Sequence, residues 1–257
     1  MKKYRDFICT NKILAISFFF PILILYISCS TTLLDQHGFR QTQTAITSLY
    51  ILDGNSLINI QTPVLGFPWI IPMEYPIYQF SVKILSLITP FGIENSGRIL
   101  STLSLYLIIF SLTYLFPLSI DNNKILYISL LTSPLLLFYS SRFLIEIFAV
   151  ALSIGAYVLF TKYKESWKFI ILISFIIVGS LSGLQKITTY LPVVIGCLLF
   201  AIKKNQFNFS ELSKIKIYLN DLLVLLISLI LPVAWVLYGD FLKNQYYILK
   251  FFTSDSL

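Results

Sequence analysis

Runs of apolar residues alternate with short polar segments along almost the whole chain. Seven of these runs approach the ~20 residues with which an α-helix crosses a hydrocarbon core about 30 Å thick. We therefore predict seven membrane-spanning helices, of which the shorter ones need tilting or a locally thinner bilayer. The runs are residues 13–33, 98–118, 125–141, 144–161, 169–184, 187–202 and 221–238. A bend is expected at Ser133-Pro134, inside the third span, because proline has no backbone N–H to donate.

The composition indicates a membrane protein and leaves no room for a large soluble domain. Hydrophobic residues make up 57% of the 257 residues and charged residues only 12%, and the mean hydropathy is +0.82. Soluble domains have about 25% charged residues. We predict an all-α polytopic membrane protein in which residues 1–257 form one transmembrane module.

The positions of lysine and arginine predict which side of the membrane each connection occupies. One more apolar stretch, Ile77–Thr89, determines the orientation of everything after it. An eighth span there would place the lysine clusters 162–168 and 203–216 outside. If it does not cross, twelve of the nineteen basic residues are cytoplasmic, in agreement with the positive-inside rule. These are Lys2, Lys3, Arg5, Lys12, Lys124, Lys162, Lys164, Lys168, Lys203, Lys204, Lys214 and Lys216. The others, Arg40, Lys83, Arg98, Arg142, Lys186, Lys243 and Lys250, are scattered singly on the outer face.

This topology places the N-terminus in the cytoplasm. We expect the chain in the plasma membrane, as a multi-pass protein of the bacterial inner membrane. The net charge of +7 follows largely from the positive-inside pattern. Membrane lipid is therefore an expected partner, with some attraction to anionic headgroups. Nucleic acid is not needed to explain the charge.

The first outer loop, residues 35–97, is longer than an ordinary connection and is expected to carry function. It contains two predicted helices. The first covers Arg40–Leu52 and ends at Asp53-Gly54-Asn55, a common helix C-terminal signal. The second, over Ile77–Thr89, reaches only ~20 Å at 1.5 Å per residue, which is too short for a crossing. We expect both helices to lie in the membrane interface.

Side chains suited to catalysis gather on this outer face. Asp35 follows the first span directly and opens a polar string that includes His37, the only histidine, and Arg40. A boundary between lipid and water suits a substrate with an apolar tail and a charged head. The topology directs further acids and bases to the same face, namely Glu74, Arg142, Glu146 and Lys186.

The three acids differ in how well a purely structural role explains them. A carboxylate at the position of Asp35 commonly caps the end of a span, so the sequence leaves a cap and a functional role equally open. Glu74, in a proline-rich segment, is also explained as a solvated loop residue. Glu146 favours function, because a carboxylate about one turn into apolar sequence is costly without a partner.

The basic candidates have structural alternatives as well. Arg40, Arg142 and Lys186 suit anchors at the membrane surface, and three cations beside acids also suit a phosphate site. His37 alone matches no zinc-ligand spacing and is equally a polar loop residue. The sequence contains no P-loop, no dinucleotide-binding glycine motif and no serine-hydrolase elbow, which excludes those enzyme classes as far as motifs can.

The order and spacing of several short motifs are typical of one enzyme family. The motifs are Asp35, Phe39-Arg-Gln-Thr-Gln-Thr-Ala45, Glu74-Tyr-Pro76, Gly97-Arg98, Ser133-Pro134, Tyr139-Ser-Ser-Arg142, Glu146, Gly183-Leu-Gln-Lys186 and Pro192. With them the chain resembles the membrane half of a GT-C glycosyltransferase. The resemblance is to the family 39 group, which includes protein O-mannosyltransferases and aminoarabinose transferases acting on lipid A.

The resemblance implies transfer of a sugar from a polyprenyl-phosphate-linked donor to a glycan, lipid or protein acceptor on the extracytoplasmic face, with inversion at the anomeric carbon. It implies that Asp35 is the catalytic general base. Glu146, as a second catalytic residue, and Glu74 would position the acceptor or hold a divalent cation. The family divides on metal use, so the resemblance leaves a metal or other cofactor open.

The same resemblance assigns the remaining candidates to substrate binding. Arg40, Arg142 or Lys186 would neutralise the departing phosphate, and His37 would line the same site. The sequence departs from the family at Gln36, where many relatives have a second acid.

Family members usually continue beyond the position at which this sequence ends, about nineteen residues after the last predicted span. We therefore expect a truncated family member and a partner that supplies the missing C-terminal half. The alternatives are a non-catalytic or degenerate relative and a carrier or flippase subunit for lipid-linked sugars. Transporters, however, tend to place ionisable groups near the middle of the membrane.

Overall fold

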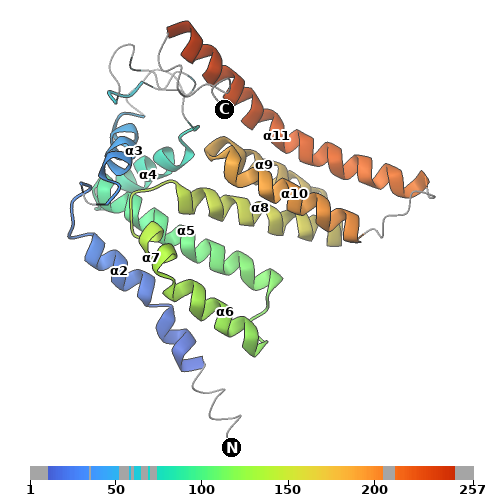
Figure 1. The fold of residues 1–257 in the computed structure, drawn as a ribbon, viewed down its shortest axis with the longest axis horizontal. Coiled ribbons are helices and arrows are strands. Elements are labelled where there is room, and N and C mark those ends of the chain that lie inside the picture. Colours follow the sequence, from blue (N-terminus) through green and yellow to red (C-terminus); the bar gives the residue numbers. More distant parts are fainter. Residues whose placement is uncertain are drawn as a thin grey trace, which may run out of the picture. The chain divides into compact units, whose positions relative to one another are not determined.

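The computed structural model describes residues 11–34, 36–51, 58, 61–64, 69, 74–204 and 212–246, and the regular elements in these ranges are helices (Figure 1). A short helix over residues 11–17 comes first. The others are α2 (Phe20–Ser28), α3 (Gly38–Tyr50), α4 (Ile77–Ile88), α5 (Ile93–Leu115), α6 (Asp121–Thr132), α7 (Pro134–Ser140), α8 (Glu146–Ser166), α9 (Phe169–Gln185), α10 (Ile187–Lys204) and α11 (Leu212–Tyr246). The predicted all-α class is confirmed for the described part of the chain.

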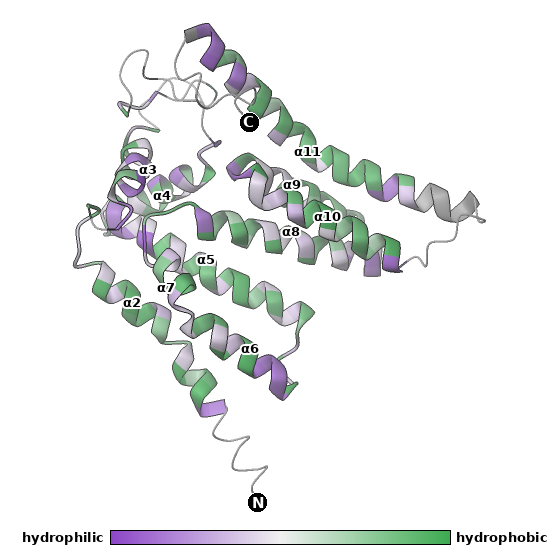
Figure 2. Ribbon diagram, viewed as in Figure 1, coloured by the Kyte–Doolittle hydropathy of each residue, from purple (hydrophilic) through white to green (hydrophobic). Residues whose placement is uncertain are grey.

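Among the described residues, five helical segments are long and apolar enough to cross a membrane, which agrees with a multi-pass membrane protein. They are Asn11–Ser28, Ile93–Leu115, Glu146–Ser166, Ile187–Lys204 and Tyr218–Gln245. Figure 2 shows hydrophobic residues along α5, α10 and α11, and hydrophilic residues at α3 and at the ends of α8 and α10. The helix α9 has 17 residues, or ~25 Å, slightly less than a crossing needs. The count of seven spans therefore stays a prediction.

The third predicted span, residues 125–141, consists of two helices. The break falls at Ser133-Pro134, as the sequence predicts, and separates α6 from α7. Ser133 has the extended angles φ −61° and ψ 120°, and Pro134 occupies the first position of α7, where its missing N–H costs nothing.

The first predicted span, residues 13–33, ends early. Its helix stops at Ser28, because hydroxyl groups beyond that point take backbone carbonyls that a helix would use. Ser30 Oγ donates to Ile27 O at 2.6 Å, and Thr31 Oγ1 donates to Ser28 O at 2.9 Å. The five residues after Ser28 therefore form turns that lead to the outer loop.

Both helices predicted in the first outer loop are present with nearly the predicted bounds. The helix α3 buries its polar stripe of Gln41, Thr44 and Ser48 and leaves Leu49 exposed. The helix α4 buries Tyr78 and Val82 and exposes aliphatic side chains, namely Ile84, Leu87 and Ile88. Exposed aliphatic faces on short helices suit a lipid boundary. Their position in a membrane interface nevertheless stays a prediction.

The chain divides into two compact units. Unit 1 comprises residues 1–55, 62–64 and 78–151, and unit 2 comprises residues 56–61, 65–77 and 152–257. The division falls inside α8. The predicted single transmembrane module is not tested by this division and stays a prediction.

In unit 1, α5 packs against α2, α3 and α7. The N-terminal part of α5 contacts α4 and the connection between α7 and α8. The Tyr78 hydroxyl of α4 donates to Gly97 O at 2.7 Å and lies 2.8 Å from Ser101 Oγ. A side chain at Gly97 would overlap the Phe143 ring, so only glycine lets the connection between α7 and α8 approach this closely.

In unit 2, α9 packs along α10 and α11, and small residues make the close approach possible. Gly179 and Gly183 lie one helical turn apart on α9, and a Cβ on Gly183 would lie 2.5 Å from Pro232 Cγ of α11. The hydroxyls of Tyr190 in α10 and Ser228 in α11 are 2.7 Å apart. Interhelical hydrogen bonds between small polar residues thus accompany the packing.

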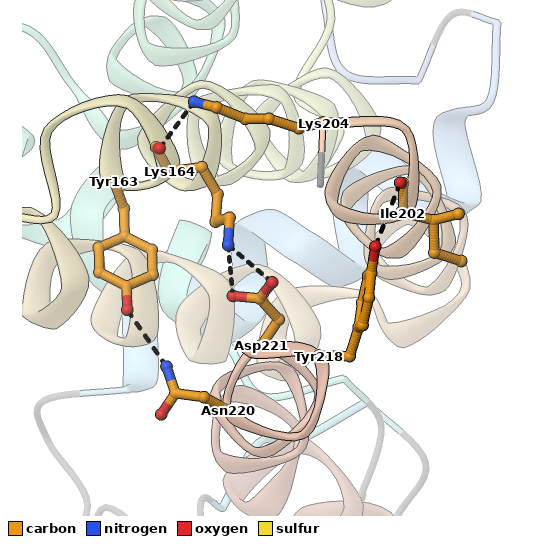
Figure 3. Close-up of polar contacts among 7 residues, drawn as sticks. All are labelled: Tyr163, Lys164, Ile202, Lys204, Tyr218, Asn220 and Asp221. Atoms are coloured by element: carbon orange, nitrogen blue, oxygen red, sulfur yellow. Dashed lines mark hydrogen bonds and ion pairs between the residues drawn. The ribbon is translucent and has the colours of Figure 1, made fainter. Parts of the chain in front are cut away.

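Lys164 of α8 and Asp221 of α11 form a buried ion pair in unit 2 (Figure 3). Lys164 Nζ lies 2.9 Å and 2.7 Å from the two carboxylate oxygens, and neither side chain is exposed. The ammonium also lies 4.2 Å from the centroid of the Trp167 ring. Lys204 Nζ of α10 donates to Lys164 O at 2.7 Å, so polar contacts join three helices here.

Candidate functional site

The first part of the candidate site is the turn that leads into α3. His37 has the left-handed backbone angles φ 62° and ψ 27°, which histidine adopts more readily than most residues, and Gly38 begins the helix. The His37 ring centroid lies 5.8 Å from that of Phe138 in α7. Asp35, the predicted general base, lies outside the described residues.

Arg40 and Glu146 form an ion pair between α3 and α8. Arg40 Nη1 lies 3.0 Å from Glu146 Oε1, and the side chains are 50% and 21% exposed. Glu146 is the first residue of α8, where the helix N-terminus favours a negative charge. A pair this exposed contributes at most about 1 kcal/mol to stability. It is accessible to a polar ligand.

Phe138 contacts two of the basic candidates. Arg142 Cζ lies 5.4 Å from the centroid of the Phe138 ring, within the range of a cation–π interaction, and His37 contacts the same ring. Unit 1 therefore brings together four of the predicted site residues, namely His37, Arg40, Arg142 and Glu146. Their roles in binding or catalysis are not tested by this geometry.

Two fully buried polar residues beside this cluster were not among the candidates that the sequence identifies. Gln41, next to Arg40, hydrogen-bonds to backbone on both sides of the cluster. In the sequence it belongs to the motif Phe39–Ala45 and to the polar stripe of α3, and neither feature shows that the side chain is buried. Arg98 is the other residue, in the second turn of α5.

Arg98 caps the C-terminal end of α2. Its Nη1 atom donates to the carbonyl oxygens of Ser28 and Thr31, the latter at 2.9 Å, and its Nη2 atom donates to Thr32 O at 3.2 Å. A cation at a helix C-terminus is stabilised by the partial negative charge of the last carbonyl groups. Arg98 thus holds the segment that precedes Asp35 in the sequence.

Glu74 and Lys186 belong to unit 2. Tyr75 N donates to Leu184 O at 3.0 Å, so the segment that carries Glu74 runs beside the end of α9, where Lys186 is the C-terminal cap residue. The Tyr75 ring packs edge-on against Trp235 with centroids 4.8 Å apart. Burial raises the pKa of the Tyr75 hydroxyl above its usual value. The predicted meeting of Asp35, Glu74 and Glu146 stays a prediction.

Among the residues that the structure describes, no group of three or more His, Cys, Asp or Glu side chains could hold a metal ion. Divalent cations prefer oxygen ligands. In the cluster the carboxylate of Glu146 is such a ligand, and it pairs with Arg40. The cluster therefore offers charged groups for a phosphate or a hydroxyl.

No protein-family model, curated protein or solved structure matches this chain. The resemblance to family 39 therefore rests on the order and spacing of the motifs in the sequence, and the function inferred from it is a proposal.

Proposed function

We propose that this chain is a membrane glycosyltransferase that moves a sugar from a polyprenyl-phosphate donor to an acceptor on the extracytoplasmic face. The observation that carries the proposal is the cluster of Arg40, Glu146, Arg142 and His37 in unit 1. Its members come from two outer connections of the predicted topology. The turn at His37 also adjoins Asp35 in the sequence.

The proposed reaction is an inverting displacement. Asp35 takes the proton of the acceptor hydroxyl while the hydroxyl oxygen attacks C1 of the sugar. The bond between C1 and the phosphate oxygen breaks, and the electron pair leaves with the polyprenyl phosphate. The departing phosphate gains negative charge in this step. Arg142 and Arg40 supply positive charge that stabilises it.

Glu146 is proposed to orient the acceptor. Its carboxylate is 21% exposed and pairs with Arg40 through Oε1, and an acceptor hydroxyl that replaces Arg40 at this oxygen would donate its hydrogen bond there. Substrate binding by Glu74 and Lys186 follows from the resemblance alone and is part of the same proposal.

The proposal includes the orientation of the site. With the N-terminus in the cytoplasm, the positive-inside rule places both His37 and Arg142 outside. The exposed aliphatic side chains of α4 and the exposed Phe39 and Leu49 of α3 would lie in the outer interface of the membrane. A polyprenyl chain in the bilayer would then present its phosphate at the depth of the cluster.

The direct test uses the full chain in lipid nanodiscs with a panel of radiolabelled undecaprenyl-phosphate sugars. The panel contains a hexose, an N-acetylhexosamine and an aminopentose, with a membrane lipid extract and short peptides as acceptors. We expect release of undecaprenyl phosphate from at least one donor and inversion at C1 in the product. A wild-type chain that binds these donors and releases none of them would contradict the proposal and favour a carrier.

A further inference from the structure

Gln41 is a fully buried polar residue in the first turn of α3. Burying an amide without hydrogen-bond partners costs at least ~1 kcal/mol, so its partners determine whether the position is tolerated. The structure supplies partners at both ends of the amide. Nε2 donates to Gln36 O at 2.9 Å, and Oε1 accepts from Phe143 N at 3.0 Å.

The two partners belong to segments that are far apart in the sequence. Gln36 directly follows Asp35, and Phe143 lies three residues before Glu146, in the connection between α7 and α8. One planar amide therefore connects the segment of the proposed base with the segment of the second catalytic carboxylate. The neighbouring pair of Arg40 and Glu146 joins the same two segments at a more exposed position.

The Phe143 side of this connection is rigid. Its ring is fully buried, lies edge-on to Tyr78 with centroids 5.8 Å apart, and fills the space left by Gly97. Leu144 N donates to Arg142 O at 2.9 Å and tightens the same turn. The Phe143 backbone is thus a fixed point, to which Gln41 attaches the turn that precedes α3.

From this geometry we infer that Gln41 is a positioning residue that fixes the turn at Gln36, the residue after Asp35 in the sequence, against the segment that leads from Phe143 into α8. Its catalytic consequence rests on the proposed transferase function. The role requires a donor and an acceptor on one side chain of this length. Glutamate keeps the acceptor and loses the donor, methionine keeps the size and loses both, and asparagine is one methylene shorter.

The first test does not depend on activity. Amide hydrogen exchange at Phe143 is measured by mass spectrometry on the full chain in nanodiscs. In Gln41→Met the exchange should be about fivefold faster or more, because the acceptor is gone. Gln41→Glu keeps an acceptor and should leave exchange at Phe143 close to wild type. Gln43→Met, in the same helix but partly exposed, is the matched control and should also leave it unchanged.

The second test uses turnover of an undecaprenyl-phosphate sugar that the wild type accepts, normalised to folded chain. Gln41→Met and Gln41→Glu should lower kcat by at least about tenfold and change KM by less than about twofold, because misplaced groups affect the reaction more than donor binding. Gln43→Met should retain both constants.

The outcomes separate the two proposals. If exchange at Phe143 is the same in Gln41→Met and wild type, the connection does not hold the segments and the inference is wrong. Wild-type kcat in Gln41→Glu would also overturn it. If the wild type turns over none of the sugars, the transferase proposal fails, and faster exchange in Gln41→Met would still support Gln41 as the connection between the two segments.

Discussion

Arg40 Nη1 lies 3.0 Å from Glu146 Oε1, and this pair joins the first turn of α3 to the first residue of α8. Half of the Arg40 side chain is exposed, so the pair contributes little stability. The pair can therefore exchange partners: an incoming phosphate would bind Arg40, or an incoming hydroxyl would bind Glu146, in place of the other member of the pair.

The first prediction concerns Glu146→Gln, which keeps the shape of the side chain and removes its charge. We expect turnover of an accepted donor to fall at least about tenfold, because the acceptor loses its orienting carboxylate. The melting temperature should change by less than about 4 °C, since the exposed pair is worth at most about 1 kcal/mol. Both are measured on the full chain in nanodiscs.

Glu94→Gln is the matched control for this substitution. Glu94 is also in the first turn of a helix and is exposed, so the change should leave turnover and melting temperature as in the wild type. Wild-type turnover in Glu146→Gln would remove Glu146 from the proposed mechanism.

The second prediction concerns the buried pair of Lys164 and Asp221 (Figure 3). Asp221→Asn leaves a buried ammonium without its carboxylate, which should cost about 3–5 kcal/mol. The double change Lys164→Met with Asp221→Leu removes both charges and should recover most of that loss. Thermal unfolding of the full chain measures both effects.

The control for the buried pair is Asp121→Asn, which breaks the pair with Lys124. Lys124 is only 7% exposed but Asp121 is 63% exposed, so this pair reaches water and the loss should be smaller than that in Asp221→Asn. Equal melting temperatures for Asp221→Asn and the wild type would show that the buried pair does not hold α8 to α11.

The third prediction concerns the packing of α9 against α11. In Gly183→Ala the new methyl group would collide with Pro232, and we expect a lower melting temperature from separation of the two helices. Gly155→Ala is the control, because no atom lies within 4 Å of the added Cβ and alanine favours a helix. A melting temperature for Gly183→Ala at or above that of Gly155→Ala would contradict the close packing.

The fourth prediction tests whether the short helix α9 crosses the membrane. Single cysteines at Lys168 and Thr188, which lie just beyond its two ends and are both exposed, should react with a membrane-impermeant maleimide from opposite sides. A cysteine at Lys203, in the exposed last turn of α10, should react from the same side as that at Lys168. If the Lys168 and Thr188 positions were labelled from the same side, α9 would not cross the membrane. The number of spans would then be smaller, and the connections after α9 would lie on the opposite side from the predicted one.

The sequence predicts features that depend on local chemistry. Proline at position 134 disfavours a continuous helix because it has no backbone N–H to donate, and the break between α6 and α7 falls there, although Pro192 and Pro232 lie inside α10 and α11. The bounds of α3 and α4 also follow from nearby turn signals and periodicity. The all-α class and the multi-pass character follow from apolar runs, which are visible without any knowledge of packing.

The residues that the sequence does not identify depend on partners far away in the chain. From the sequence, Gln41 is a polar residue of a loop helix and Arg98 lies at the end of a span. The folded contacts show that both are fully buried. The sequence places Lys164 in a cytoplasmic lysine cluster, whereas in the structure its side chain is buried against Asp221. The cost of burying a charge is visible only once its neighbours are known.

The measurement that most directly tests the proposed sugar transfer compares Asp35→Asn with Asp53→Asn in the outer loop. With an undecaprenyl-phosphate sugar that the wild type accepts, Asp35→Asn should lower kcat by about 100-fold or more and leave donor binding within about twofold, because the base is lost. Asp53→Asn, in the predicted turn after α3, should retain wild-type kcat. Wild-type kcat in Asp35→Asn would contradict the proposed mechanism.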